Sequence, residues 1–214
     1  LRQVIRYYAK PNSQVDRDEL VGLFDCLDVV LDAKSKLYLS NAPSAIRDKW
    51  GYEKILHESA KPAQQLALLT LAVKGFFEFL SNKQASFRTG LMRIENDVPV
   101  EWLTFEPRLH PPRTTPEMLA APTSAIMRAI KGGALVVIQD LEAELKKKNK
   151  DDRRCVGGAN ADRRGSLLTY PIYCANIKKI IYVLSVLGDR AGCLQESEWE
   201  RYNWLLENFA SRII

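Results

Sequence analysis

Two runs of β-branched, aromatic and leucine residues near the end of the chain most constrain the fold. They span residues 166–173 and 180–187, and the short segment 175–178 connects them. Runs of this composition and spacing predict an antiparallel β-hairpin. Alternation along the first run places apolar side chains on both of its faces. The hairpin is therefore predicted to lie inside a sheet that is covered on both sides.

Two amphipathic helices are predicted at the borders of this region. Residues 62–81 carry apolar side chains spaced three and four apart, at Leu66, Leu69, Val73, Phe76 and Leu80. A helix near 197–213 repeats this spacing at Trp199, Tyr202, Leu206, Phe209 and Ile213. Such spacing is typical of helices that pack on a core or on each other. The helix at 62–81 has further apolar residues off this stripe, which predicts burial against two surfaces.

The segment between these helices reads as short strands and loops. A second hairpin is predicted at 86–95 and 99–106, with its turn at 95–98. A proline-rich loop follows at 106–116, then a short helix at 123–130 that ends at Gly132-Gly133 and a buried strand at 134–138. The loop Lys146–Arg164 concentrates eight Lys and Arg residues and is the most polar part of the chain.

The C-terminal pattern resembles that of a GAF domain. It begins with Arg164-Gly165-Ser166-Leu167-Leu168 and continues, two residues later, through Pro171-Ile172 and a short turn. It ends with Ile180-Ile181-Tyr182-Val183-Leu184-Ser185-Val186 and an acidic helix. The resemblance covers roughly residues 60–214. It implies an α/β (α+β) fold in which an antiparallel sheet of five or six strands has both terminal helices on one face and variable loops over the other.

The chain departs from the family pattern at Tyr182, where a glycine is usual. We expect the bulky ring to fill space that other members leave open. The first sixty residues are rich in charge but carry enough leucine and aromatic residues to pack. We therefore predict two parts, a helical extension at 1–60 and a GAF-like domain at 61–214.

Composition limits the cellular location and the class of binding partner that we expect. Of the 214 residues 46% are apolar, and no apolar stretch reaches the length of a membrane span. The four cysteines, Cys26, Cys155, Cys174 and Cys193, have no Cys-x-x-Cys spacing and only two histidines accompany them. We therefore expect no metal site, reduced thiols and a cytoplasmic location. A net charge of +5 is compatible with an anionic ligand and does not indicate nucleic acid.

Candidate ligand-binding residues fall into two groups. The basic loop contributes Arg153, Arg154, Arg163 and Arg164, which either attract an anionic ligand to the cleft or form a solvated surface. The second group comprises Arg93 and the aromatic residues Trp102, Tyr170 and Tyr182. Arg93 lies in a predicted strand and needs a carboxylate or a ligand as partner. The aromatic rings either line a pocket for a planar ligand or belong to the core.

A thiol-dependent enzyme is the least favoured alternative at this stage. Cys174 follows a hairpin strand and Cys155 lies in the basic loop. Either is a candidate nucleophile, because nearby Lys or Arg can lower the pKa of a thiol. Some GAF-like proteins are methionine sulfoxide reductases that use loop cysteines, but the cysteine spacing here does not match theirs. No histidine lies nearby in the sequence to act as a base.

We accordingly expect a non-enzymatic sensory or regulatory module of signal transduction. It would bind a small anionic ligand and relay the signal to an output domain through the helices at 62–81 and 197–213, which would also form a homodimer. A ligand-free dimerisation or protein-interaction platform is the alternative that Tyr182 suggests. The sequence does not identify a cofactor.

Overall fold

The computed structural model describes residues 17–59, 61–149, 152–155 and 164–210. A five-stranded antiparallel sheet forms the centre, with strand order β2-β1-β5-β4-β3. Its strands are β1 (Phe87–Glu95), β2 (Val98–Glu106), β3 (Val136–Ile138), β4 (Ser166–Cys174) and β5 (Lys179–Gly188). This confirms the α+β fold class and the hairpin predicted from the two C-terminal runs.

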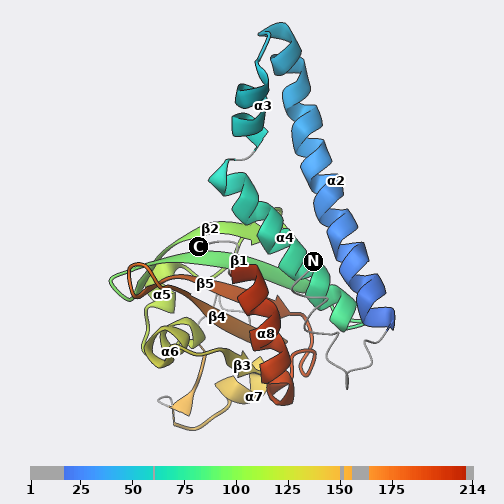
Figure 1. Cartoon of the computed structure of the whole chain (residues 1–214). Helices are drawn as coiled ribbons and strands as arrows, with labels where there is room; N and C mark the ends of the chain where they lie inside the picture. The colour runs from blue at the N-terminus through green and yellow to red at the C-terminus, as the bar shows by residue number, and fades with distance from the viewer. Residues whose placement is uncertain (1–16, 60, 150–151, 156–163, 211–214) are drawn as a thin grey trace.

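Helices α4 (Pro62–Leu80) and α8 (Trp199–Ala210) cover one face of this sheet (Figure 1). Their apolar side chains and those of alternate strand residues form the largest core cluster, which includes Phe77, Phe87, Leu184 and Leu206. Phe77 contacts both Phe87 and Tyr202, with ring centroids 5.8 and 5.5 Å apart. The terminal helices therefore share one face, as the sequence predicts.

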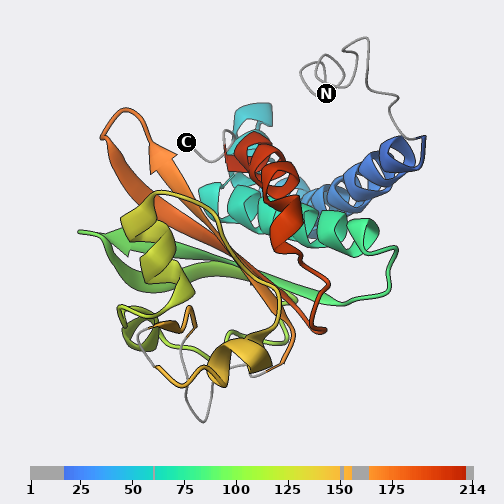
Figure 2. The same cartoon turned by 90° about the horizontal axis from the view of Figure 1, so that it is seen from below.

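The opposite face is covered by short elements and loops, which lie on the other side of the sheet from α4 and α8 (Figure 2). These elements are α5 (Pro116–Leu119), α6 (Ala125–Gly132) and α7 (Leu141–Leu145). Ser124 caps α6 by accepting a hydrogen bond from the Met127 amide at 3.0 Å, and Gly133 ends it in the left-handed conformation at φ 59°. Asp140 caps α7 by accepting from the amides of Glu142 and Ala143.

The first hairpin turns tightly because Asn96 and Asp97 adopt left-handed conformations, with φ of 51° and 61°. Asn and Asp tolerate this region better than other residues with a Cβ. Strand β2 lies at the edge of the sheet, which explains how it accommodates Pro99 without a lost ladder bond inside the sheet.

The N-terminal region contains two helices, α2 (Arg17–Arg47) and α3 (Tyr52–Ser59). Helix α2 packs along α4 and extends beyond the sheet (Figure 1). Helix α2 continues through Pro43 to Arg47. A proline inside a helix costs a hydrogen bond without always ending the helix. None of the helices in the described ranges is long and apolar enough to cross a membrane. The domain boundary near residue 60 stays a prediction.

Candidate functional site

A cavity of about 100 Å³ lies between the sheet and the layer of short elements. The strands contribute its floor through small or apolar residues, among them Gly90, Leu167, Thr169 and Ser185. The proline-rich loop, α5, α6 and α7 form the cover, with Pro112, Thr114, Leu119, Ile126 and Leu141. The cavity therefore lies on the face of the sheet opposite the terminal helices, between the sheet and the loops.

Trp102 forms one wall of this cavity because the neighbouring strand has no side chain at Gly90. A Cβ on Gly90 would lie 2.8 Å from Cζ3 of the indole, which is closer than real contacts allow. The indole nitrogen donates a hydrogen bond to the Thr114 carbonyl oxygen at 3.1 Å. This bond ties the proline-rich loop to the sheet and fixes the ring against the cavity.

Polar groups of both signs also line the cavity. Arg88 and Arg113 contribute guanidinium groups, His110 contributes an imidazole, and Glu106 contributes a carboxylate. The Glu106 side chain is only 14% exposed and pairs with the Nε of Arg108 at 3.3 Å. An aromatic wall with charges of both signs suits a small polar molecule more than a purely apolar one.

Cys155 also lines the cavity, packs in one core cluster with Leu141, and has only 5% of its surface exposed. Burial raises the pKa of its thiol to about 11, and the negative charge of Glu144 acts in the same direction. The positive charges of Arg153, Lys147 and Arg154 lower the pKa but are outweighed. The group at the cavity is therefore a protonated thiol at neutral pH. Cys174 and Cys193 are also free thiols, and neither is among the described residues that line the cavity.

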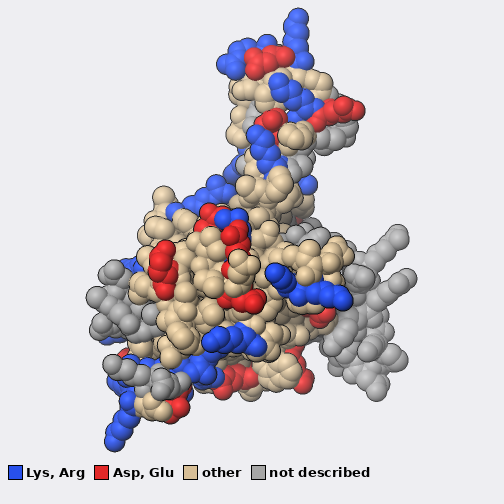
Figure 3. All heavy atoms as spheres, turned by 90° about the vertical axis from the view of Figure 1, so that its left-hand side faces the viewer, with Lys and Arg blue, Asp and Glu red and all other residues tan. Residues whose placement is uncertain are grey.

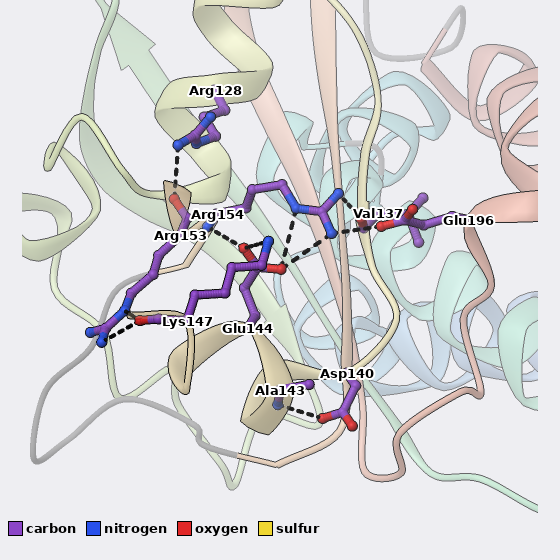
Figure 4. A network of polar contacts seen from close by, with 9 residues as sticks. All are labelled: Arg128, Val137, Asp140, Ala143, Glu144, Lys147, Arg153, Arg154 and Glu196. Atoms are coloured by element: carbon purple, nitrogen blue, oxygen red, sulfur yellow. Dashed lines mark hydrogen bonds and ion pairs between the residues drawn. The ribbon is translucent and has the colours of Figure 1, made fainter. Parts of the chain in front are cut away.

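The segment that carries Cys155 is held by a network of polar contacts centred on Arg154 and Glu144 (Figure 4). The Arg154 guanidinium contacts the Glu144 carboxylate at 3.2 Å and the Glu196 carboxylate at 2.6 Å. It also donates to the Val137 carbonyl oxygen at 3.2 Å. Burial opposes the charge on Arg154, but the two carboxylates outweigh this and raise its pKa.

The arginines predicted to bind a ligand have different surroundings in the structure. Arg154 is engaged in this network, and Arg153 donates to the Lys147 carbonyl oxygen at 3.0 Å. Arg164 is exposed, and Arg163 lies outside the described residues. Arg93 pairs with Glu95 at 2.8 Å and with Glu101 at 2.9 Å. Figure 3 shows one face of the molecule, on which acidic and basic side chains are interspersed rather than gathered by sign. Whether an anionic ligand meets these arginines stays a prediction.

The predicted aromatic residues divide between the two faces of the sheet. Trp102 lines the cavity, whereas Tyr170 and Tyr182 pack against the core cluster under α4 and α8. Burial raises the pKa of Tyr170, as does the charge of Glu207. Tyr182 therefore does not fill the cavity, contrary to the expectation from the departure at this position. The reason is the alternation of the strand, which directs Val183 and Ser185 differently from Tyr182.

Sequence reasoning missed Gly90, Glu106, His110, Arg113 and Glu144. The only local signals were a glycine within an apolar strand, which often marks a close approach of another group, and a proline-rich loop long enough to be functional. Within the described ranges, no group of three or more His, Cys, Asp or Glu side chains is placed to hold a metal ion.

No protein-family model matches the sequence, and no curated protein matches it. Solved structures similar to this chain include two of the free methionine-R-sulfoxide reductase of Staphylococcus aureus. The complex with substrate has 15% identity and a TM-score of 0.44 over 72% of this chain and 94% of that chain. The reduced form has 16% identity and a TM-score of 0.43 over 72% and 93%. The free methionine-R-sulfoxide reductase of Neisseria meningitidis, in complex with its substrate, has 15% identity and a TM-score of 0.41 over 94% and 92%.

The structure is α+β, with a five-stranded antiparallel sheet and both terminal helices on one face, as the resemblance implies. The expectation of a non-enzymatic sensory module of signal transduction is contradicted, because these similar structures are all of reductases. The expected ligand-free platform falls with it, since its basis was a cavity filled by Tyr182. The physical reason for the error is that a fold does not fix a function, and the sequence did not show that Cys155 reaches the cavity. At these identities the likeness extends to the fold alone.

Proposed function

We propose that the chain is a thiol-dependent enzyme that acts on a small polar molecule in the cavity, with Cys155 as the reacting group. The observation that carries this proposal is the position of Cys155. Cys155 lines the same cavity as an indole ring, a carboxylate, two guanidinium groups and an imidazole. A buried cysteine with only a packing role needs no such polar surroundings.

The protonation state of the thiol favours one class of reaction. Thiol–disulfide exchange requires a thiolate, and the raised pKa of Cys155 disfavours it. Attack on a sulfoxide, in contrast, consumes a proton, because the oxygen must leave the sulfur. The thiolate is the nucleophile in this attack as well, so the Cys155 proton must pass to the sulfoxide oxygen as the sulfur–sulfur bond forms. Reduction of a sulfoxide has an acceptor for that proton in its own substrate, whereas attack on a disulfide has none.

The reaction balances with an external thiol as the reductant. The Cys155 sulfur attacks the sulfoxide sulfur, the thiol proton moves to the oxygen, and the oxygen is transferred to give a sulfide and a cysteine sulfenic acid. A first external thiol condenses with the sulfenic acid, forms a mixed disulfide and releases water. A second external thiol then attacks this disulfide and regenerates the Cys155 thiol. In total one sulfoxide is reduced and two thiols are oxidised to a disulfide.

The size of the cavity limits the substrate. Its volume of about 100 Å³ is smaller than the cavity of about 150 Å³ that holds benzene. A molecule as large as an amino acid is therefore not held entirely within this space. The proline-rich loop is the element of the cover that the Trp102 hydrogen bond ties to the sheet.

Free methionine-R-sulfoxide is the first substrate to test, with dithiothreitol as the reductant and methionine formation as the readout. We expect turnover by the wild type and loss of it in Cys155→Ser. Cys174→Ser is the matched control, because Cys174 is also buried and free but is not among the cavity residues. Circular dichroism of each variant confirms the fold.

Two results would overturn the proposal. One is turnover in folded Cys155→Ser equal to that of the wild type, which would exclude this thiol. The other is the absence of turnover with the R and S forms of free methionine sulfoxide and with dimethyl sulfoxide, a much smaller sulfoxide.

A further inference from the structure

Glu144 is the most deeply buried carboxylate near the proposed reacting group. Its side chain is only 3% exposed, on helix α7. One oxygen accepts a hydrogen bond from the Arg154 backbone amide at 2.7 Å and pairs with Lys147 at 2.9 Å. The other oxygen accepts from the Arg154 guanidinium, from Nε at 3.3 Å and Nη2 at 3.2 Å. Glu144 therefore accepts hydrogen bonds from both the backbone and the side chain of Arg154, the residue before Cys155.

The same short segment is held on its other sides as well. The Arg128 guanidinium donates to the Arg153 carbonyl oxygen at 2.9 Å, which connects the segment to α6. Arg154 reaches strand β3 at the Val137 carbonyl oxygen and the segment before α8 at Glu196. In Figure 4 these contacts converge on Arg153 and Arg154 from several elements. The position of the Cys155 backbone is thus set by contacts that do not involve Cys155 itself.

We propose that Glu144 is the positioning residue of the Cys155 thiol: it holds the segment in place through its hydrogen bonds to Arg154 and brings a buried negative charge to that segment. This inference rests on the proposed function, since the thiol that it positions is the one proposed to react. It goes further by assigning a role to a side chain that does not line the cavity.

The charges around Cys155 determine the direction in which Glu144 shifts the pKa of the thiol. Burial is the largest cause of the raised pKa, and Glu144 adds to it. Arg153, Lys147 and Arg154 act in the opposite direction. His110, Arg113, Arg88 and Glu106 share the cavity with the thiol. The carboxyl of Glu144 is itself opposed by burial, but hydrogen bonds from Lys147 and Arg154 outweigh this and lower its pKa. Glu144 therefore stays ionised over the pH range in which a thiol is studied.

The test is the rate at which iodoacetamide alkylates Cys155 as a function of pH, read for this cysteine alone by peptide mass spectrometry. In Glu144→Gln the amide oxygen can still accept the backbone hydrogen bond, but the charge is gone. We expect the midpoint of the alkylation profile to move to lower pH. Half a pKa unit is enough for a roughly threefold faster reaction near neutral pH.

Glu142→Gln is the matched control, because Glu142 lies on the same helix, is exposed and pairs with Lys146 at 2.7 Å. We expect its alkylation profile to match the wild type. Lys147→Gln should give the opposite sign, with slower alkylation, because it removes a charge that lowers the pKa of Cys155. Loosening of the segment alone would speed alkylation in both variants and would not give opposite signs.

An unchanged alkylation profile in folded Glu144→Gln would overturn the inference, and so would faster alkylation in Lys147→Gln. If Glu144→Gln does not fold, Lys147→Gln decides, since Lys147 is 42% exposed and tolerates substitution. Sulfoxide turnover is measured in parallel. Failure of the proposed function would remove turnover from the wild type while leaving the alkylation result intact, so that the two outcomes are distinguishable.

Discussion

Replacing Gly90 by alanine tests the contact that gives the cavity its aromatic wall. The new Cβ would lie 2.8 Å from Cζ3 and 3.0 Å from Cε3 of Trp102. The ring cannot simply rotate away, because its nitrogen is bound to the Thr114 carbonyl and the indole packs against the core cluster of Met92 and Ile126. Either the strands separate or the indole leaves its position.

The expected loss of stability follows from two opposing effects. Overpacking of a filled site costs roughly 1–3 kcal/mol. Alanine also gains about 0.5–1 kcal/mol over glycine within a strand, because the unfolded chain has less freedom to lose. We therefore expect Gly90→Ala to lower the free energy of unfolding by about 1–2 kcal/mol. Gly132→Ala is the control: it lies at the end of α6 with nothing within 4 Å of the added Cβ.

The assay is equilibrium unfolding in urea followed by circular dichroism. Gly132→Ala should be stabilised by about 0.5 kcal/mol, since it gains helix propensity and meets no neighbour. The cost of Gly90→Ala should shrink in a Trp102→Leu background, because the two residues are in contact. A Gly90→Ala protein as stable as the wild type, or the same cost in both backgrounds, would refute the reasoning.

Two further predictions concern the thiol and the assembly. Because the Cys155 pKa rises from 9.0 to about 11 on folding, the folded state holds the thiol proton more tightly, and stability falls as the pH rises from 9 through 11. Between about pH 8 and about pH 10.5 the wild type should lose about 2 kcal/mol more than Cys155→Ser. The buried tyrosines titrate in both proteins and cancel, so an equal loss would contradict this. We also propose a homodimer through α4 and α8. Trp199 is 53% exposed on α8, so Trp199→Glu should weaken the dimer. Light scattering that shows a monomeric wild type at all concentrations would exclude this dimer.

Local chemistry explains which parts of the fold the sequence could predict. The turn at Asn96-Asp97, the stop at Gly132-Gly133 and the hairpin of β4 and β5 each depend on residues close in sequence. Alternation also separated the side chains of β4 correctly, with Leu168 and Tyr170 on one face and Leu167 and Thr169 on the other. These signals act over a few residues and need no knowledge of the rest of the chain.

The site could not be predicted in the same way, because alternation does not say which layer covers which face. Both faces of the central strands are apolar. Alternation therefore shows which residues lie on the same face as Tyr182, but it does not show that the helices cover this face. The cavity also needs Gly90, Trp102 and Cys155 to converge from distant parts of the sequence. Arg154 belongs to a loop whose charges could all have been solvated, and nothing local in the sequence shows that it pairs with the buried carboxylate of Glu144.

The two faces of the sheet explain why the cavity lies where it does. The face under α4 and α8 is covered by long helices, whose apolar stripes fill the space with Phe77, Leu206 and their neighbours. The other face is covered by short elements of four, eight and five residues, joined by loops. Short elements bring few side chains to the sheet and fix themselves by caps and ion pairs instead, as Asp140, Ser124 and Arg154 do. The cover of short elements therefore leaves the cavity between itself and the sheet, and Cys155 is among the buried residues that line it.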